Sequence, residues 1–114
     1  MKAPAETDTR GWILKVLAAN DGLRQPMAFG LMRKSLRNVC IDLSVNGLAS
    51  EAVYLEEAGY IACHRRKDIP GYEAREGCRA GGGRPSDILA LKLTRKGLDL
   101  VQGALPADPG VSVE

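Results

Sequence analysis

The sequence predicts a small α+β domain that is mostly helical, with three helices, a β-hairpin and a last helix in that order. Three observations support this fold class. Apolar residues recur at helical spacing in three successive segments before residue 60. Two short segments, 60–64 and 88–94, have the composition of strands, and the second alternates between leucines and other residues. A length of 114 residues with 45% hydrophobic residues suits one domain with a packed core.

The first helix is expected to begin at Asp8 or Thr9, either of which can cap it, and to end near Asn20. Gly22 follows as a stop signal, because glycine takes positive φ without strain. The apolar stripe of this helix consists of Trp12, Ile13, Val16 and Leu17.

The second helix is expected to begin near Pro26, since proline is favoured in a first helical turn. Its expected buried residues are Met27, Leu31, Met32 and Leu36, followed by Val39 and Ile41 as core residues. The third helix starts after Ser44 and buries Leu48, Ala52 and Leu55, which recur at i, i+4 and i+7. Gly59 is expected to end it.

The two expected strands are joined by a long connection, residues 65–87, which is rich in glycine, proline and charge. Connections of this length are usually functional or mobile. Thr94 is expected to cap the last helix, in which Leu98 and Val101 are buried. The predicted organisation is a flexible N-terminus over 1–8, a domain over 9–103 and an extended C-terminal tail over 104–114.

Three helices followed by a two-stranded β-hairpin is the order of a winged helix-turn-helix, in which the hairpin is the wing. In helix-turn-helix proteins the second helix of the motif enters the major groove of DNA, whose width admits one helix. The third helix of this chain is therefore the expected recognition helix.

A resemblance supports the same fold. The segment "SVNGLASEAVYLEEAGYI" is similar to the recognition-helix region of small winged-helix regulators, "LTRKGLDLVQG" resembles the start of their last helix, and "GALPADPGV" extends the likeness. Over residues 11–111 the chain resembles small winged-helix proteins, often labelled ArsR-like, of Mu-like phages and prophages. The resemblance implies a phage or prophage origin and a role in transcription regulation.

The third helix offers Asn46, Ser50 and Tyr54 toward its open side, all usable for contacts with base edges. It has no Lys or Arg, and it carries three glutamates. Because phosphates repel a carboxylate, Glu51 is expected to point inward or to form an ion pair.

The basic residues are expected to contact phosphates, which gives affinity without sequence information. They lie on the second helix and in the wing, where Arg84, beside three glycines, is a candidate for a narrow minor groove. The candidates are Arg33, Lys34, Arg37, Arg65, Arg66, Lys67 and Arg84.

Other site types have weaker patterns. The segment "GGGRPSD" lacks the spacing of a phosphate-binding loop, and there is no constellation typical of an enzyme. The three cysteines and one histidine do not have the spacing of structural zinc ligands. Cys40 and Cys63 are expected in the core. Cys78, in the wing, leaves a metal- or redox-sensing role open.

The sequence thus predicts a cytoplasmic protein of a bacterial host that binds double-stranded DNA as a homodimer, without a cofactor. Its charge of +2 is ordinary, so this prediction depends on where the basic residues lie. The chain has neither a signal-peptide pattern nor an apolar run of about 18 residues, so no membrane span is expected. The main alternative is a winged-helix module that binds another protein instead of DNA.

Overall fold

A computed structural model describes residues 6–65, 88–106 and 108–111 of the chain. In these residues it contains four helices and a three-stranded antiparallel sheet. The elements in order are α1 (Glu6–Ala19), β1 (Met27–Ala28), α2 (Phe29–Arg37), α3 (Val45–Glu57), β2 (Ile61–Arg65), β3 (Ile88–Leu93) and α5 (Arg95–Val101). The predicted mostly helical α+β class is confirmed. None of the helices described is long and apolar enough to cross a membrane.

The sheet has the strand order β1–β3–β2, with β3 in the middle. The prediction of a two-stranded hairpin was incomplete, because Met27 and Ala28 pair with Leu91 and Ala90 of β3. This extra strand also corrects the start of the second helix. The helix begins at Phe29, after Ala28 as its N-cap, and Pro26 lies before the strand.

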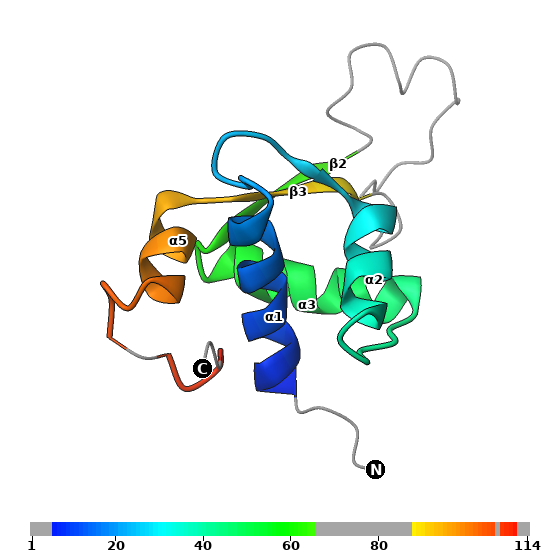
Figure 1. The fold of residues 1–114 in the computed structure, drawn as a ribbon, viewed down its shortest axis with the longest axis horizontal. Coiled ribbons are helices and arrows are strands. Elements are labelled where there is room, and N and C mark those ends of the chain that lie inside the picture. Colours follow the sequence, from blue (N-terminus) through cyan, green and yellow to red (C-terminus); the bar gives the residue numbers. More distant parts are fainter. Residues whose placement is uncertain (1–5, 66–87, 107, 112–114) are drawn as a thin grey trace.

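The core lies between the sheet and the three helices α1, α2 and α3, with α5 at one end of the sheet (Figure 1). In α2 the buried residues are Phe29, Met32 and Leu36, spaced i, i+3 and i+7. Leu31 was expected in the core but is 50% exposed, because it lies about 100° around the helix from Met32 on the side away from this stripe. In α1 the buried residues are Ile13, Leu14 and Leu17, whereas Trp12 and Val16 are partly buried.

Both predicted ends of α3 are confirmed. The Ser44 hydroxyl accepts a hydrogen bond from the Gly47 amide at 2.9 Å, which satisfies a donor of the first turn. Gly59 has φ +89°, and the Tyr60 amide donates to the Leu55 carbonyl, as at a helix that ends on a left-handed glycine. Leu48, Ala52 and Leu55 are fully buried. This stop leads the chain directly from α3 into β2.

Two loop predictions need correction. After α1 it is Asp21, not Gly22, that has positive φ (+60°). Glycine is needed at position 22 for a steric reason instead, because a Cβ atom there would lie only 2.7 Å from the Leu17 carbonyl oxygen. Cys40 was expected in the core, but it is exposed and has φ +66°, since the chain reverses there so that Ile41 can be buried.

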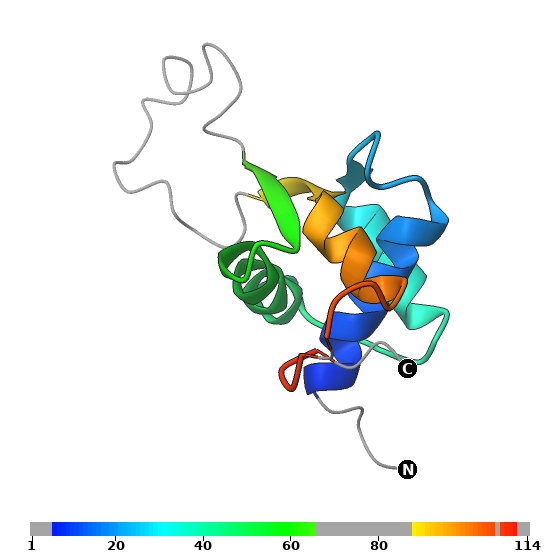
Figure 2. The same ribbon diagram turned by 90° about the vertical axis from the view of Figure 1, so that its left-hand side faces the viewer.

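The last helix begins as predicted, since the Thr94 hydroxyl accepts from the Gly97 amide at 3.1 Å. Leu100 is its buried leucine, whereas Leu98 and Val101 are only partly buried. Beyond it, a turn at residues 108–111 packs near the start of α1, and Val111 is 2% exposed (Figures 1 and 2). We call residues 108–111 the C-terminal turn.

Candidate nucleic-acid interface

The outward face of α3 carries Asn46, Ser50 and Glu57, all exposed. At about 100° per residue these three positions lie within about 40° of one another around the helix. Helix α1 packs against the other side of α3, and no described element covers the outward face (Figure 2). Asn46 and Ser50, two of the predicted base-contacting residues, are therefore placed together at the start of the helix. Glu57 lies on the same face at its end.

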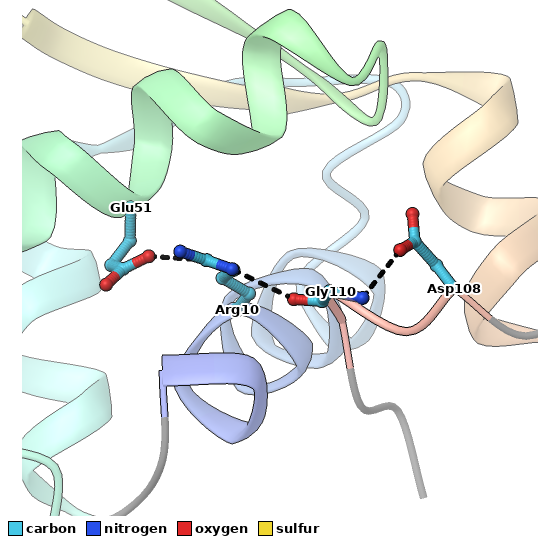
Figure 3. Close-up of polar contacts among 4 residues, drawn as sticks. All are labelled: Arg10, Glu51, Asp108 and Gly110. Carbon is cyan, nitrogen blue, oxygen red and sulfur yellow. Dashed lines mark hydrogen bonds and ion pairs between the residues drawn. The ribbon is translucent and has the colours of Figure 1, made fainter.

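One edge of this face is closed by an ion pair between α1 and α3. Arg10 Nε donates to Glu51 Oε1 at 2.6 Å, and the two side chains are only 15% and 11% exposed (Figure 3). The prediction that Glu51 points inward or is paired is confirmed on both counts. A buried carboxylate without a partner would be costly, so the Arg10 cation is what allows a glutamate at this position.

Arg10 also contacts the side chain of Tyr54. The Arg10 guanidinium lies over the Tyr54 ring, 3.6 Å from the ring centroid, in a cation–π contact. Tyr54 is 37% exposed, so one part of its surface remains open while the other is packed. Tyr54 was predicted to face the open side of α3, and the structure places it at the edge of that side.

The opposite edge of α3 is closed by a second ion pair. Arg65, at the end of β2, donates through Nη1 and Nη2 to the two carboxylate oxygens of Glu56, at 2.8 and 2.6 Å. This bidentate geometry is the strong form of an Arg–carboxylate ion pair. Arg65 was predicted to contact phosphates. In this structure its guanidinium instead binds Glu56, and the side chain is 19% exposed.

The three basic residues predicted on α2 differ in their surroundings. Arg33 Nε donates to the Leu43 carbonyl oxygen at 3.1 Å, so it holds the loop between α2 and α3. Arg37 lies 3.3 Å from Asp42 and is 56% exposed, a geometry that water and salt easily disrupt. Lys34 is exposed. Lys34 and Arg37 are therefore the α2 cations best placed to meet a partner.

Arg66, Lys67, Arg84 and Cys78 lie outside the described residues. The predictions that the first three contact DNA, and that the Cys78 thiol is reactive, stay predictions.

A hydrogen-bonded pair ties the C-terminal turn to the end of α3. Tyr60 Oη donates to Asp108 Oδ2 at 2.6 Å, and the Gly110 amide donates to Asp108 Oδ1 at 2.7 Å. The hydrogen bond to Asp108, with burial second, raises the pKa of Tyr60 to about 12. The same hydrogen bond, followed by that from Gly110, lowers the pKa of Asp108. Both shifts favour the pair as it stands, a neutral phenol donating to a carboxylate.

No local pattern in the sequence indicates that Arg10 or Asp108 is a structural residue near α3. Arg10 lies 41 residues from Glu51 in the chain, and Asp108 lies 48 residues from Tyr60. Pairings of this kind depend on how the helices pack. The acidity of α3 was the one usable clue, because it requires that cations be found nearby.

The described part of the chain offers little support for a metal site or a reactive thiol. No group of three or more His, Cys, Asp or Glu residues there could hold a metal ion. Cys63 is 8% exposed, as predicted, and burial raises the pKa of its thiol to about 12. Such a thiol stays protonated and unreactive at neutral pH.

Comparison of the chain with protein-family models, curated proteins and solved structures found no match. The resemblance to winged-helix proteins of Mu-like phages therefore stays a prediction.

Proposed function

We propose that this chain is a winged-helix protein that binds double-stranded DNA through α3, and that it acts in transcription regulation by binding rather than by catalysis. The observation that carries the proposal is the outward face of α3, where Asn46 and Ser50 are exposed and both flanking glutamates, Glu51 and Glu56, are paired with arginines.

The order of the elements supports the winged-helix part of the proposal. A short strand precedes α2, and the helices α2 and α3 are followed by the antiparallel pair β2 and β3, with β1 on the far edge of β3. This arrangement leaves α3 at the surface beside the strands that would carry the wing. A helix exposed in this way is of a size that the major groove admits.

The charges around α3 support the DNA part. An unpaired carboxylate near phosphates is repelled, and α3 carries three glutamates. Two of them are neutralised by Arg10 and Arg65, so the helix has less negative charge to offer than its sequence suggests. Lys34 and Arg37, both exposed in the last turn of α2, supply cations on the helix that precedes α3 in the chain.

A second candidate function is a protein-binding module. Glu57 lies exposed on the outward face of α3 at its end, and the apolar Val45 is 38% exposed at the start of the same helix. A carboxylate and an apolar side chain suit a protein partner better than a phosphate backbone. We regard this as the alternative that the same experiment must decide.

The proposal includes a homodimer in the cytoplasm of a bacterial host, because two-fold proteins match palindromic sites. Sedimentation of the free protein and of its complex with DNA would test the dimer, and a monomer in both would remove it from the proposal.

Fluorescence anisotropy tests DNA binding directly. The wild-type protein is titrated into a labelled mixed-sequence duplex of about 30 base pairs over a series of salt concentrations. Phosphate contacts predict that log Kd rises linearly with log salt, by about 0.9 per contact. A Lys34→Ala/Arg37→Ala variant should bind more weakly and with a shallower salt dependence, because it lacks two of these contacts.

The matched control is Arg24→Ala. Arg24 is 82% exposed in the loop 20–26 after α1. This loop lies on the other side of the molecule from α3 (Figure 2). Losing this charge should change Kd much less than losing Lys34 and Arg37. If the wild-type protein shows no binding even at about 20 mM salt, where phosphate contacts are strongest, DNA binding is wrong and the protein-binding candidate takes its place.

A further inference from the structure

Arg10, on α1, contacts two other parts of the molecule, α3 and the C-terminal turn. Its Nε donates to Glu51 of α3, and its Nη1 donates to the Gly110 carbonyl oxygen of the C-terminal turn at 3.2 Å (Figure 3). Its guanidinium also lies over the Tyr54 ring of α3. The Arg10 and Gly110 residues are 100 positions apart in the chain. A single guanidinium thus joins α1, α3 and the turn.

The C-terminal turn is itself held in place by contacts that do not involve Arg10. Asp108 accepts hydrogen bonds from Tyr60 and from the Gly110 amide, and Val111 is buried in the core. The turn therefore presents the Gly110 carbonyl from a fixed position. Hydrogen bonds to Glu51 on one side and to this carbonyl on the other fix the direction in which the guanidinium points.

Glu51 lies next to the outward face of α3. At about 100° per residue its Cα position is about 100° around the helix from Ser50 and about 60° from Tyr54. If Arg10 were absent, the Glu51 carboxylate would have no cation at 2.6 Å and would turn out of its buried site toward water on this face. The negative charge would then lie beside Asn46 and Ser50.

We infer that Arg10 is a positioning residue for DNA binding by α3: it keeps the Glu51 carboxylate neutralised and turned away from the phosphates, and the C-terminal turn holds it there. This inference rests on the proposed DNA-binding function. It also gives residues 108–111 a functional role, because they hold Arg10 where it neutralises the Glu51 carboxylate of α3.

Arg10 is poorly suited to contact a phosphate directly. Its side chain is 15% exposed, and its donors face Glu51 and Gly110. A residue that acts through Glu51 has a different signature from one that touches DNA. Removing it weakens binding only while the Glu51 carboxylate is present, so Glu51→Gln should restore the affinity.

The test measures Kd by anisotropy, on one mixed-sequence duplex at several salt concentrations, for the wild type, Arg10→Gln, Glu51→Gln and the double variant. Arg10→Gln should bind about fivefold more weakly at about 0.1 M salt, the size expected of one uncompensated charge close to phosphates. The double variant should return to within about twofold of the wild type, because the carboxylate is gone.

Two control variants sharpen the result. Arg24→Gln removes the same charge from an exposed loop and should leave Kd almost unchanged. Arg10→Lys keeps a cation beside Glu51 and should retain most of the affinity, although it cannot reproduce both hydrogen bonds.

The inference is overturned if the double variant binds as weakly as Arg10→Gln, because Arg10 would then act without Glu51, as a direct phosphate contact does. A wild-type protein that does not bind DNA is a different result, since it removes the proposed function itself.

If Arg10→Gln fails to fold, as judged by circular dichroism, Tyr60→Phe takes its place. This change keeps the buried ring and removes only the hydroxyl that holds Asp108. The variant should bind DNA about twofold more weakly, the effect of one loosened hydrogen bond, and Glu51→Gln should restore it. If Glu51→Gln restores nothing, the C-terminal turn does not act through Arg10 and Glu51.

Discussion

At each edge of α3 a glutamate is paired with an arginine, but the contacts that form the two ion pairs differ. At one edge Arg10 pairs with Glu51 through a single hydrogen bond, supported by the Tyr54 ring and the Gly110 carbonyl. At the other edge Arg65 pairs with Glu56 through two hydrogen bonds on the next strand. The first pair is 15% and 11% exposed, the second 19% and 29%.

Of these two ion pairs, the more buried one does not have the better hydrogen-bond geometry. The better hydrogen-bond geometry belongs to the more exposed pair, which water and salt screen more strongly. The more buried pair, Arg10 and Glu51, is supported by residues of α1, α3 and the C-terminal turn. If Arg10 is removed, the Glu51 carboxylate has less access to water than Glu56 has when Arg65 is removed. We therefore expect the edge formed by Arg10 to matter more for stability, although its contact with the glutamate is the simpler one.

The largest expected effect is that of Arg10→Gln on stability. It should lower the free energy of unfolding by about 2–3 kcal/mol, because Glu51 loses its cation and must turn out of a buried site to reach water. Urea unfolding followed by circular dichroism measures this change. The control Arg24→Gln, at an exposed position, should cost less than about 0.5 kcal/mol. A cost for Arg10→Gln no larger than that of the control would contradict our ranking of the two edges.

The second effect concerns the support of Arg10. A Cβ atom on residue 110 would collide with the Tyr54 hydroxyl, so Gly110→Ala should destabilise the protein by about 1–2 kcal/mol. Tyr54→Phe removes that hydroxyl and should reduce the cost of Gly110→Ala to less than half in the double variant. Thermal or urea unfolding of the four proteins gives the coupling. Equal costs in both backgrounds would show that the turn does not pack on Tyr54.

The third effect is that of Arg65→Gln, the counterpart at the other edge. We expect a loss of about 1 kcal/mol, since Glu56 is 29% exposed and can be solvated when its partner is removed. About 0.5 M NaCl should weaken the contribution of this pair more than that of Arg10 and Glu51. Double-variant cycles with Glu51→Gln and Glu56→Gln at two salt concentrations measure both contributions. The opposite order of salt sensitivity would refute the comparison.

The smallest effect is the response of the C-terminal turn to acid. The pKa of Asp108 is lowered in the folded state by its hydrogen bonds from Tyr60 and Gly110. The stability that this provides is fully present above the unfolded-state pKa of about 3.9 and is lost as the pH falls through the lower folded-state value. The NMR shift of the Gly110 amide, which donates to Asp108, should report this midpoint.

Asp108→Asn is the control for that titration, and it should remove the acid transition at Gly110. A Gly110 midpoint close to 3.9 in the wild type would mean that Tyr60 and Gly110 do not stabilise the carboxylate.

Local signals were enough to predict most of the fold. Ser44, Gly59 and Thr94 mark helix ends through their own backbone and side-chain geometry, so the sequence around each is sufficient. The strand β1 was missed because two residues carry no periodicity of their own. They become a strand only through pairing with β3, more than 60 residues later.

The candidate site was predicted less completely for the same reason. Asn46 and Ser50 follow from the periodicity of α3, since a residue opposite the apolar stripe must be exposed. The roles of Arg33 and Arg65 could not be read in this way. Both are basic residues near α3, and only the packing decides that one binds the Leu43 carbonyl and the other binds Glu56.

The most direct test of DNA binding by α3 is an NMR titration of the uniformly ¹⁵N-labelled protein with a mixed-sequence duplex at about 50 mM salt, where phosphate contacts are strong. Our proposal predicts that the amide shifts concentrate on residues 34–38 and 45–50 among the described residues, with little change in the loop 20–26. Shifts confined to other elements would contradict the proposal that α3 is the helix that contacts DNA, and the absence of any shift would contradict DNA binding itself.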